Sequence, residues 1–155
     1  MYGNSFGVIY DDVTSFSAFG ELHADINRNL TLGVNAEISG YDTDEQEEAW
    51  NLPVYRGSLF GDYRIGEHWS TGTNIFFVGK RKDLYLPFNS TPTTPEIVDL
   101  DGYVDINLRL GYRFNDQVSL FAKANNIANN RYARWMNYPV QGFQILGGVT
   151  FKFDM

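Results

Sequence analysis

The fold of this chain is decided by one stretch near its C-terminal end, Val104-Asp105-Ile106-Asn107-Leu108-Arg109-Leu110-Gly111-Tyr112-Arg113-Phe114. Its even-numbered residues are all apolar, whereas its odd-numbered residues are charged, polar or glycine. Because successive side chains of a β-strand point to opposite sides, this alternation predicts a strand with one apolar face and one polar face. The final segment, 143–153, repeats the pattern, with apolar residues or glycine at its odd positions.

Similar segments recur along the chain and predict an all-β protein. We predict eight antiparallel strands, at 1–10 (the weakest pattern), 16–26, 30–38, 55–65, 69–80, 104–114, 118–125 and 143–153. Short polar turns are expected at 27–29, 66–68 and 115–117, and long connections at 42–53, 84–99 and 129–141. The connection 84–99 contains Pro87, Pro92 and Pro95, which favour a loop over a strand. Alternating short turns and long loops are typical of up-and-down outer-membrane barrels.

The distribution of aromatic residues indicates which face meets lipid. On the apolar face, aromatic residues occur near the short turns and again toward the long loops, and aliphatic residues lie between them. An aliphatic band between two aromatic girdles is typical of a transmembrane β-barrel, whereas a soluble barrel would place its apolar face inside. We therefore predict that the odd positions of 143–153 face hydrocarbon and that the polar face lines the lumen.

Length and composition limit the other possibilities. A chain of 155 residues corresponds by size to a single domain, here predicted as 1–155. It has no cysteine, which excludes disulfides and thiolate metal sites, and its start resembles no signal peptide. The net charge of −7 comes largely from an acidic loop within 41–53. That loop has no calcium-loop spacing, and we interpret it as a solvated surface loop.

Several motifs in the last third resemble the closing strands of TonB-dependent outer-membrane receptors. They are Leu100-Asp101-Gly102-Tyr103-Val104-Asp105-Ile106-Asn107, Leu110-Gly111-Tyr112-Arg113-Phe114, Val118-Ser119-Leu120-Phe121, Asn125-Asn126-Ile127, Tyr132, Tyr138-Pro139, Gly142, Leu146-Gly147-Gly148 and Phe151-Lys152-Phe153. The sequence departs from the family pattern at Ala128, Asn129, Gln141 and Phe143, and Asp154-Met155 extends past the usual terminal aromatic residue.

The resemblance implies energy-coupled uptake of a bulky nutrient, such as a metal chelate or a glycan, across the outer membrane of a Gram-negative bacterium. It implies the lipid bilayer and the barrel assembly machinery as partners, and TonB only through a plug domain, which we do not find in this chain. Nucleic acid is not an expected partner. Family barrels have many more strands than eight, so we expect the C-terminal part of a larger barrel.

Two alternatives stay open at this level. A self-contained eight-stranded barrel could serve a structural, adhesion or binding role, and a soluble barrel could bind a ligand inside. Because an unpaired strand edge in lipid leaves costly unsatisfied backbone groups, we predict that any folded form of this chain alone is a closed eight-stranded barrel without a continuous pore.

No pattern for catalysis is present, so we predict that the protein is not an enzyme and has no cofactor. His23 and His68 have no partner at metal-ligand spacing, and no metal site is predicted. The candidates for ligand contact are Arg131, Arg134, Trp135 and Tyr138, which occur together in a predicted external loop. Arginine and aromatic side chains are effective binding residues, although loop aromatics also pack against the barrel rim.

Overall fold

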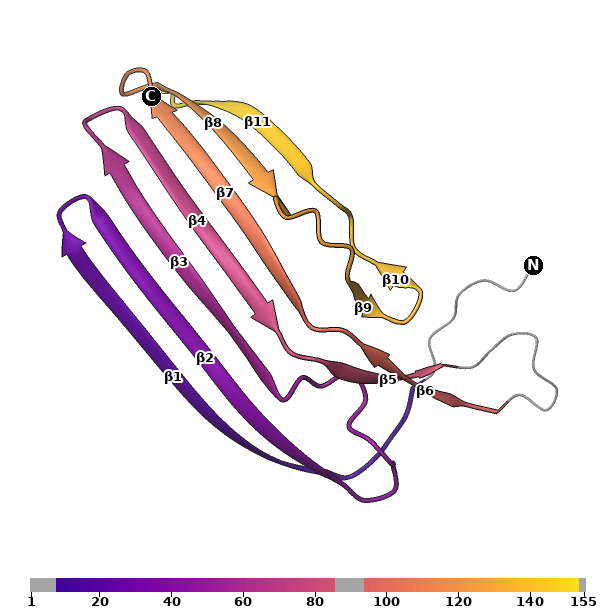
Figure 1. The fold of residues 1–155 in the computed structure, drawn as a ribbon. Helices are drawn as coiled ribbons and strands as arrows, with labels where there is room; N and C mark the ends of the chain where they lie inside the picture. The colour runs from indigo at the N-terminus through magenta and orange to yellow at the C-terminus, as the bar shows by residue number, and fades with distance from the viewer. Residues whose placement is uncertain (1–7, 86–93, 154–155) are drawn as a thin grey trace, which may run out of the picture.

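The computed structural model describes residues 8–85 and 94–153 and shows one large antiparallel sheet. Its seven strands lie in the order β1-β2-β3-β4-β7-β8-β11 (Figure 1). Their bounds are Val13–Asn27 for β1, Leu30–Thr43 for β2, Tyr55–Ile65 for β3, Trp69–Val78 for β4, Tyr103–Arg113 for β7, Val118–Asn125 for β8 and Gln144–Phe151 for β11. The predicted up-and-down antiparallel fold is confirmed, and the three short turns lie together at one end of the sheet.

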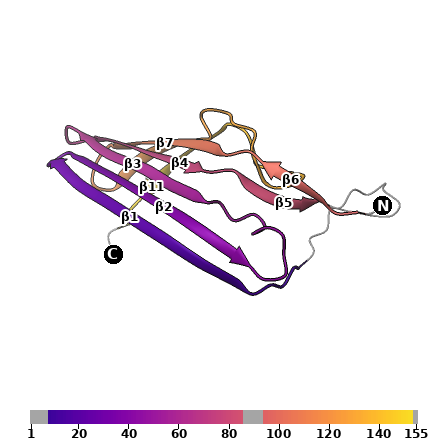
Figure 2. The same cartoon turned by 60° about the horizontal axis from the view of Figure 1, so that its bottom comes forward.

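Two small hairpins lie at the opposite end of the sheet. The first pairs β5 (Arg81–Tyr85) with β6 (Glu96–Leu100), and the second pairs β9 (Ala133–Trp135) with β10 (Tyr138–Pro139). Figure 2 shows that β5 and β6 extend beyond the ends of β4 and β7. The prediction that 84–99 is only a loop was therefore wrong. Pro95 lies immediately before the first residue of β6, and the β-branched residues Ile97 and Val98 favour an extended strand.

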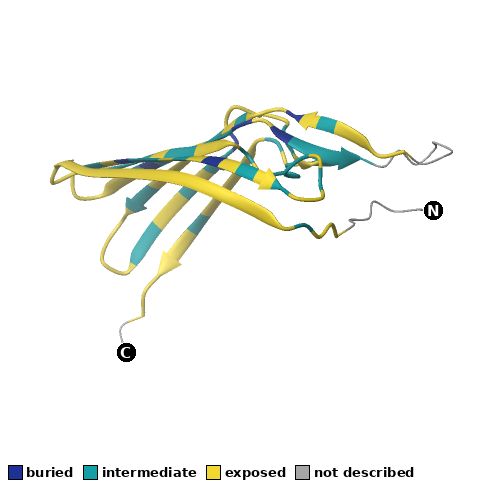
Figure 3. Ribbon diagram, turned by 90° about the horizontal axis from the view of Figure 1, so that it is seen from below, coloured by how far each residue is buried: buried dark blue, intermediate teal, exposed yellow. Residues whose placement is uncertain are grey.

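The sheet is open within the described residues, and the prediction of a closed eight-stranded barrel was wrong. β1 and β11 are its edges, and each pairs on one side only. The predicted first strand, 1–10, lies mostly outside the described residues, and Val8–Tyr10 are not in a strand. β1 is exposed along its whole length (Figure 3). A curved sheet with two free edges has the form of a section of a larger barrel wall.

Cross-strand pairing confirms the predicted division into two faces. One row of paired residues on the apolar face runs through Leu22, Val34, Leu59, Ile75 and Ile106. Ile145, Gly147, Val149 and Phe151 of β11 continue this face through their partners in β8. Among the described residues, its paired positions carry no charged side chain from the short turns up to the pair Phe16–Gly40.

Aromatic rings gather on the apolar face near the short turns. The ring centroids of Trp69 and Tyr112, which are cross-strand partners, lie 4.6 Å apart. Phe151 and Phe153 follow at the end of the chain, with centroids 4.7 Å apart. These positions match one of the two predicted aromatic girdles. Within residues 8–85 and 94–153, no helix is long and apolar enough to cross a membrane.

The polar face is held together partly by ion pairs between strands of the sheet. Arg56 of β3 donates to Glu37 of β2, with 2.8 Å between Nη2 and Oε2. Arg109 of β7 pairs with Asp62 of β3 across the intervening strand β4. Exposed pairs of this kind contribute little stability, so the sheet depends chiefly on its backbone ladders and apolar packing.

Candidate ligand-contact site at the loop end

The β9–β10 hairpin places two of the predicted site residues opposite each other. Trp135 of β9 pairs with Tyr138 of β10, and Met136 and Asn137 form the turn between them. Asn137 has a φ of 66°, a left-handed conformation that asparagine tolerates better than most residues. The sequence of the turn therefore suits the close approach of the two aromatic residues.

A cavity of about 440 Å³ lies between this hairpin and the ends of the long strands. Its lining includes three of the four predicted residues, Arg134, Trp135 and Tyr138, whereas Arg131 is exposed and is not part of it. The other lining residues are Asp105, Asn125, Asn126, Tyr132, Pro139, Val140, Gln141 and Gln144. The role of all four predicted residues in binding stays a prediction.

Sequence reasoning missed the contributions of the long strands to this cavity. Asp105, Asn125 and Gln144 lie at the loop ends of β7, β8 and β11, and all three belong to the polar face. Their odd or even positions in the alternating pattern place all three on the polar face, so the sequence could have indicated which face they belong to. Their proximity to the β9–β10 hairpin depends on how the loop folds back, which the alternation does not contain.

Asn126 organises the base of the loop that carries the hairpin. Its side chain is only 4% exposed, and its Nδ2 donates to the carbonyl oxygens of Asn130 and Gln141 at 3.0 and 3.1 Å. Its Oδ1 accepts from the backbone N–H of Asn130 at 2.9 Å. One buried carboxamide thus joins the two ends of the loop, which explains the Asn125-Asn126 motif in physical terms.

Tyr132 and Asp105 line the floor of the cavity, and the ring of Tyr103 stacks on Tyr132. The rings of Tyr103 and Tyr132 are parallel within 3°, with centroids 3.6 Å apart. The Tyr132 hydroxyl donates to Oδ2 of Asp105 at 2.8 Å. Burial, followed by this hydrogen bond to a carboxylate, raises the pKa of the Tyr132 hydroxyl, which therefore stays protonated as a donor. Oδ1 of Asp105 is buried without a partner among the described residues.

The chemistry of the site favours a ligand with both aromatic and anionic groups. Trp135 and Tyr138 present ring surfaces, and Arg134 presents a guanidinium that can stack on a ring or pair with anionic oxygens. Arg131 adds a second positive charge on the same loop. This combination provides contacts to a bulky, charged ligand, but it includes no nucleophile–base pair for catalysis.

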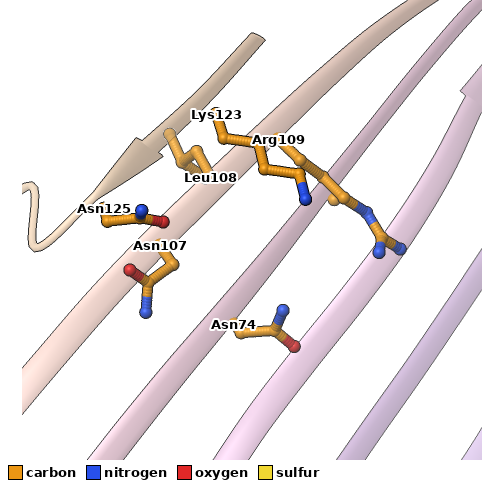
Figure 4. Close-up of a pocket in the computed structure, with 7 residues that line it drawn as sticks. Asn74, Asn107, Leu108, Arg109, Lys123 and Asn125 are labelled. Atoms are coloured by element: carbon orange, nitrogen blue, oxygen red, sulfur yellow. The ribbon is translucent and has the colours of Figure 1, made fainter. Parts of the chain in front are cut away.

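A second, smaller cavity of about 300 Å³ lies on the polar face between β4, β7 and β8 (Figure 4). It contains a row of carboxamides from neighbouring strands, Asn74, Asn107 and Asn125, beside Arg109 and Lys123. Gly72 leaves space for the Arg109 side chain, because a Cβ at position 72 would overlap the Arg109 guanidinium. The surface offers amide donors and positive charge to polar groups in the lumen.

Both histidines contact other parts of the sheet. Nδ1 of His68 lies 2.8 Å from the carbonyl oxygen of Arg113 beside the short turn. His23 lies on the polar face, edge-on to Phe60 with ring centroids 5.5 Å apart. Residues 8–85 and 94–153 contain no cluster of three or more histidine, aspartate or glutamate side chains arranged to hold a metal ion.

Comparison with protein families identifies the class of protein that this sheet belongs to. Residues 6–127 match the family described as TonB dependent receptor-like, beta-barrel. Because this match covers most of the sequence, the chain belongs to the β-barrel family of TonB-dependent receptors, which are outer-membrane proteins of Gram-negative bacteria and not enzymes. A comparison with curated proteins gave no match.

Solved structures similar to this chain include three receptors with low sequence identity. The ferripyoverdine receptor of the outer membrane of Pseudomonas aeruginosa superposes with a TM-score of 0.79 at 13% identity, covering 92% of this chain and 20% of the receptor. The siderophore receptor PiuA from Acinetobacter baumannii gives 0.72 at 14%, covering 92% and 22%. The ferric-catecholate import receptor Fiu from E. coli K12 gives 0.73 at 15%, covering 93% and 22%.

These superpositions establish the fold as part of a larger receptor barrel. The chain spans only about one fifth of the length of the solved receptors it matches. A chain that forms only part of a barrel should leave two sheet edges open, as the seven-stranded sheet does. The expectation that the chain is the C-terminal part of a TonB-dependent receptor barrel is confirmed.

Proposed function

We propose that this chain forms a section of barrel wall and part of the external ligand-contact surface of a receptor that takes up a bulky metal chelate. The observation that carries the proposal is the gathering of Arg134, Trp135 and Tyr138 around the cavity at the loop end of the polar face. Its support from the comparisons is that similar solved structures are described as receptors for ferric siderophores.

The side chains of the site suit a ferric chelate better than a neutral glycan. Iron chelates built from catecholates carry negative charge on aromatic rings, and Arg134 can contact both features at once. Trp135 and Tyr138 add stacking surface, and Arg131 contributes positive charge at the rim. A glycan would use the aromatic residues but would gain little from two arginines.

The proposed partners of the receptor are inferred from the apolar face of the sheet and from the family. The apolar face contacts the lipid bilayer, and insertion requires the barrel assembly machinery. Coupling to TonB would occur through a plug domain, which is not among the described strands. In this arrangement the long loops are external and the short turns are periplasmic, as in other outer-membrane barrels.

Binding measurements on the complete protein that contains this chain test the proposal. Trp135→Ala and Arg134→Ala should each weaken binding of ferripyoverdine or a ferric catecholate by about tenfold or more, because aromatic and arginine anchors dominate binding energy. Arg131→Ala should have a smaller effect, since its side chain does not line the cavity.

Lys80→Ala is the matched control at the same end of the sheet. Lys80 is 75% exposed, lies 3.9 Å from Asp101, and is not part of the cavity lining. Loss of binding in this control as large as in the Arg134 variant would contradict the proposal, as would binding of neither ferric probe to the wild-type protein.

A further inference from the structure

The β9–β10 hairpin is fixed by side chains of two other segments rather than by its own two short strands. Arg81 of β5 donates from Nη2 to the carbonyl oxygen of Ala133 at 2.8 Å and from Nη1 to that of Arg134 at 3.4 Å. Oδ2 of Asp83, also in β5, accepts from the N–H of Met136 at 2.6 Å. Strand β9 and the turn of the hairpin are therefore tied to β5 through backbone groups of the hairpin.

The second segment that contacts the hairpin is the loop between β2 and β3. Nδ2 of Asn51, in the loop between β2 and β3, donates to the carbonyl oxygen of Arg134 at 2.7 Å. Asn51 is itself held on β5, because its N–H donates to the carbonyl oxygen of Lys82 at 2.6 Å, and its φ is 60°. The carbonyl oxygen of Arg134 thus accepts from strand β5 and from the loop between β2 and β3.

Arg81 also connects the hairpin to the pair of stacked tyrosines beside the cavity. It is only 7% exposed, and its guanidinium carbon lies 5.4 Å from the centroid of Tyr103, whose ring stacks on Tyr132. A buried cation is costly unless its surroundings compensate for lost hydration. Here the compensation comes from the hairpin carbonyls and a tyrosine ring. The cation therefore favours the hairpin position that supplies those carbonyls.

Successive residues of β5 point to opposite sides of the strand, and only one side contacts the hairpin. Arg81 and Asp83 lie on one side of the strand and contact the hairpin. Lys82, between them, instead lies 3.4 Å from Glu48 and 3.8 Å from Asp99, and it is 43% exposed. One strand of five residues therefore carries both the proposed contacts and a built-in control.

We propose that Asn51, Arg81 and Asp83 are positioning residues that hold the β9–β10 hairpin in its ligand-binding conformation before the ligand arrives. The side chains of Arg134, Trp135 and Tyr138 are then presented without the entropic cost of ordering the loop on binding. This inference rests on the proposed function for the identity of the ligand, but the fixed hairpin is a property of the protein alone.

Amide hydrogen exchange tests the hairpin without any ligand. In the complete protein, Arg81→Met and Asp83→Ala should each raise the exchange rates of the Met136 and Val140 amides by about tenfold. Each variant removes hydrogen bonds between a charged side chain of β5 and the backbone of the hairpin. Lys82→Met should leave both rates unchanged. Arg81→Lys and Asp83→Asn each keep one hydrogen-bonding group, so their rates should fall between wild type and the disruptive variants.

Binding of ferripyoverdine or a ferric catecholate then tests the connection to the ligand. Arg81→Met should weaken binding by about tenfold in the wild-type background and by about threefold in a Trp135→Ala background, because its effect passes through the hairpin and only Arg134 and Tyr138 are then left to position. A purely structural role for Arg81 would lower binding equally in both backgrounds and would overturn the inference.

The two proposals fail in distinguishable ways. If the wild-type protein binds neither ferric probe, the proposed function fails, and the exchange rates still decide whether the hairpin is fixed in advance. If Arg81→Met and Asp83→Ala leave the exchange of Met136 and Val140 unchanged in correctly folded protein, the inference is wrong whatever the ligand is. Arg81→Lys covers the case in which Arg81→Met does not fold.

Discussion

The seven-stranded wall and the β9–β10 hairpin are stabilised in different ways. The wall is a repeating structure in which backbone ladders and an unbroken apolar face involve many residues, each of modest importance. The hairpin has five strand residues, and a few hydrogen bonds from Arg81, Asp83 and Asn51 fix its position. The wall should therefore tolerate most single changes that keep its two faces, whereas the hairpin should respond to single polar substitutions.

The largest effect is expected where a charge is placed on the apolar face of the wall. Ile75→Arg lies in the middle row of the central strands and should cost about 2–4 kcal/mol if that row is near the bilayer midplane. Asn74→Arg, one residue away on the polar face, should cost much less. Denaturant unfolding of the complete protein in lipid vesicles measures both, and equal costs would contradict the assignment of the faces.

A smaller effect is expected at the boundary between the wall and the hairpin. Tyr132→Phe removes the donor to Asp105, whose other carboxylate oxygen is already unpartnered, and should cost about 1–3 kcal/mol. Combining it with Asp105→Asn should recover part of the loss, because the remaining buried group is neutral. The free energies of unfolding of the two single variants and the double variant test this coupling; simple additivity would argue against it.

The smallest effect concerns the acidic loop beside the wall. The Asp11 carboxylate accepts from the N–H groups of Glu45 and Gln46 at 2.9 and 3.0 Å. These hydrogen bonds, the one from Glu45 first, lower the pKa of Asp11 below its usual 3.8. Because the folded pKa is lowered, the contact is complete above 3.8 and is lost as the pH falls through the lower folded value.

Amide chemical shifts of Glu45 and Gln46 measure this loop contact directly. Both should stay constant from pH 7 to pH 5 and should move together only in acid below the usual aspartate range. In Asp11→Ala the acid transition of these two amides should disappear. A transition centred well above 3.8 would show that the carboxylate is not stabilised by the loop.

The wall could be predicted from the sequence because its signal is local. Alternation in 104–114 and 55–65 predicted both the strands and their faces, and the pairing in the structure confirms them. The number of strands and the open edges could not be predicted, because local alternation carries no information about closure. β6 was missed because the nearby prolines indicate a loop, although Pro95 only precedes the strand.

The candidate site could be predicted only in part. Arg134, Trp135 and Tyr138 were found from their residue types in a long loop, and the structure brings them together. Asp105 and Gln144 join them only through cross-strand register and the folding back of the loop. The contacts of Arg81 are made to backbone carbonyls, which every residue carries, so no residue pattern could indicate them.

Site-directed spin labelling along β7 tests the assignment of the two faces most directly. The chain has no cysteine, so single cysteines at successive positions from 104 to 110 can each be labelled specifically in the complete protein in lipid vesicles. The labels at 104, 106, 108 and 110 should be accessible to oxygen in the bilayer, and those at 105, 107 and 109 should not. The opposite phase, or no alternation between neighbouring positions, would contradict a barrel wall with its apolar face in lipid.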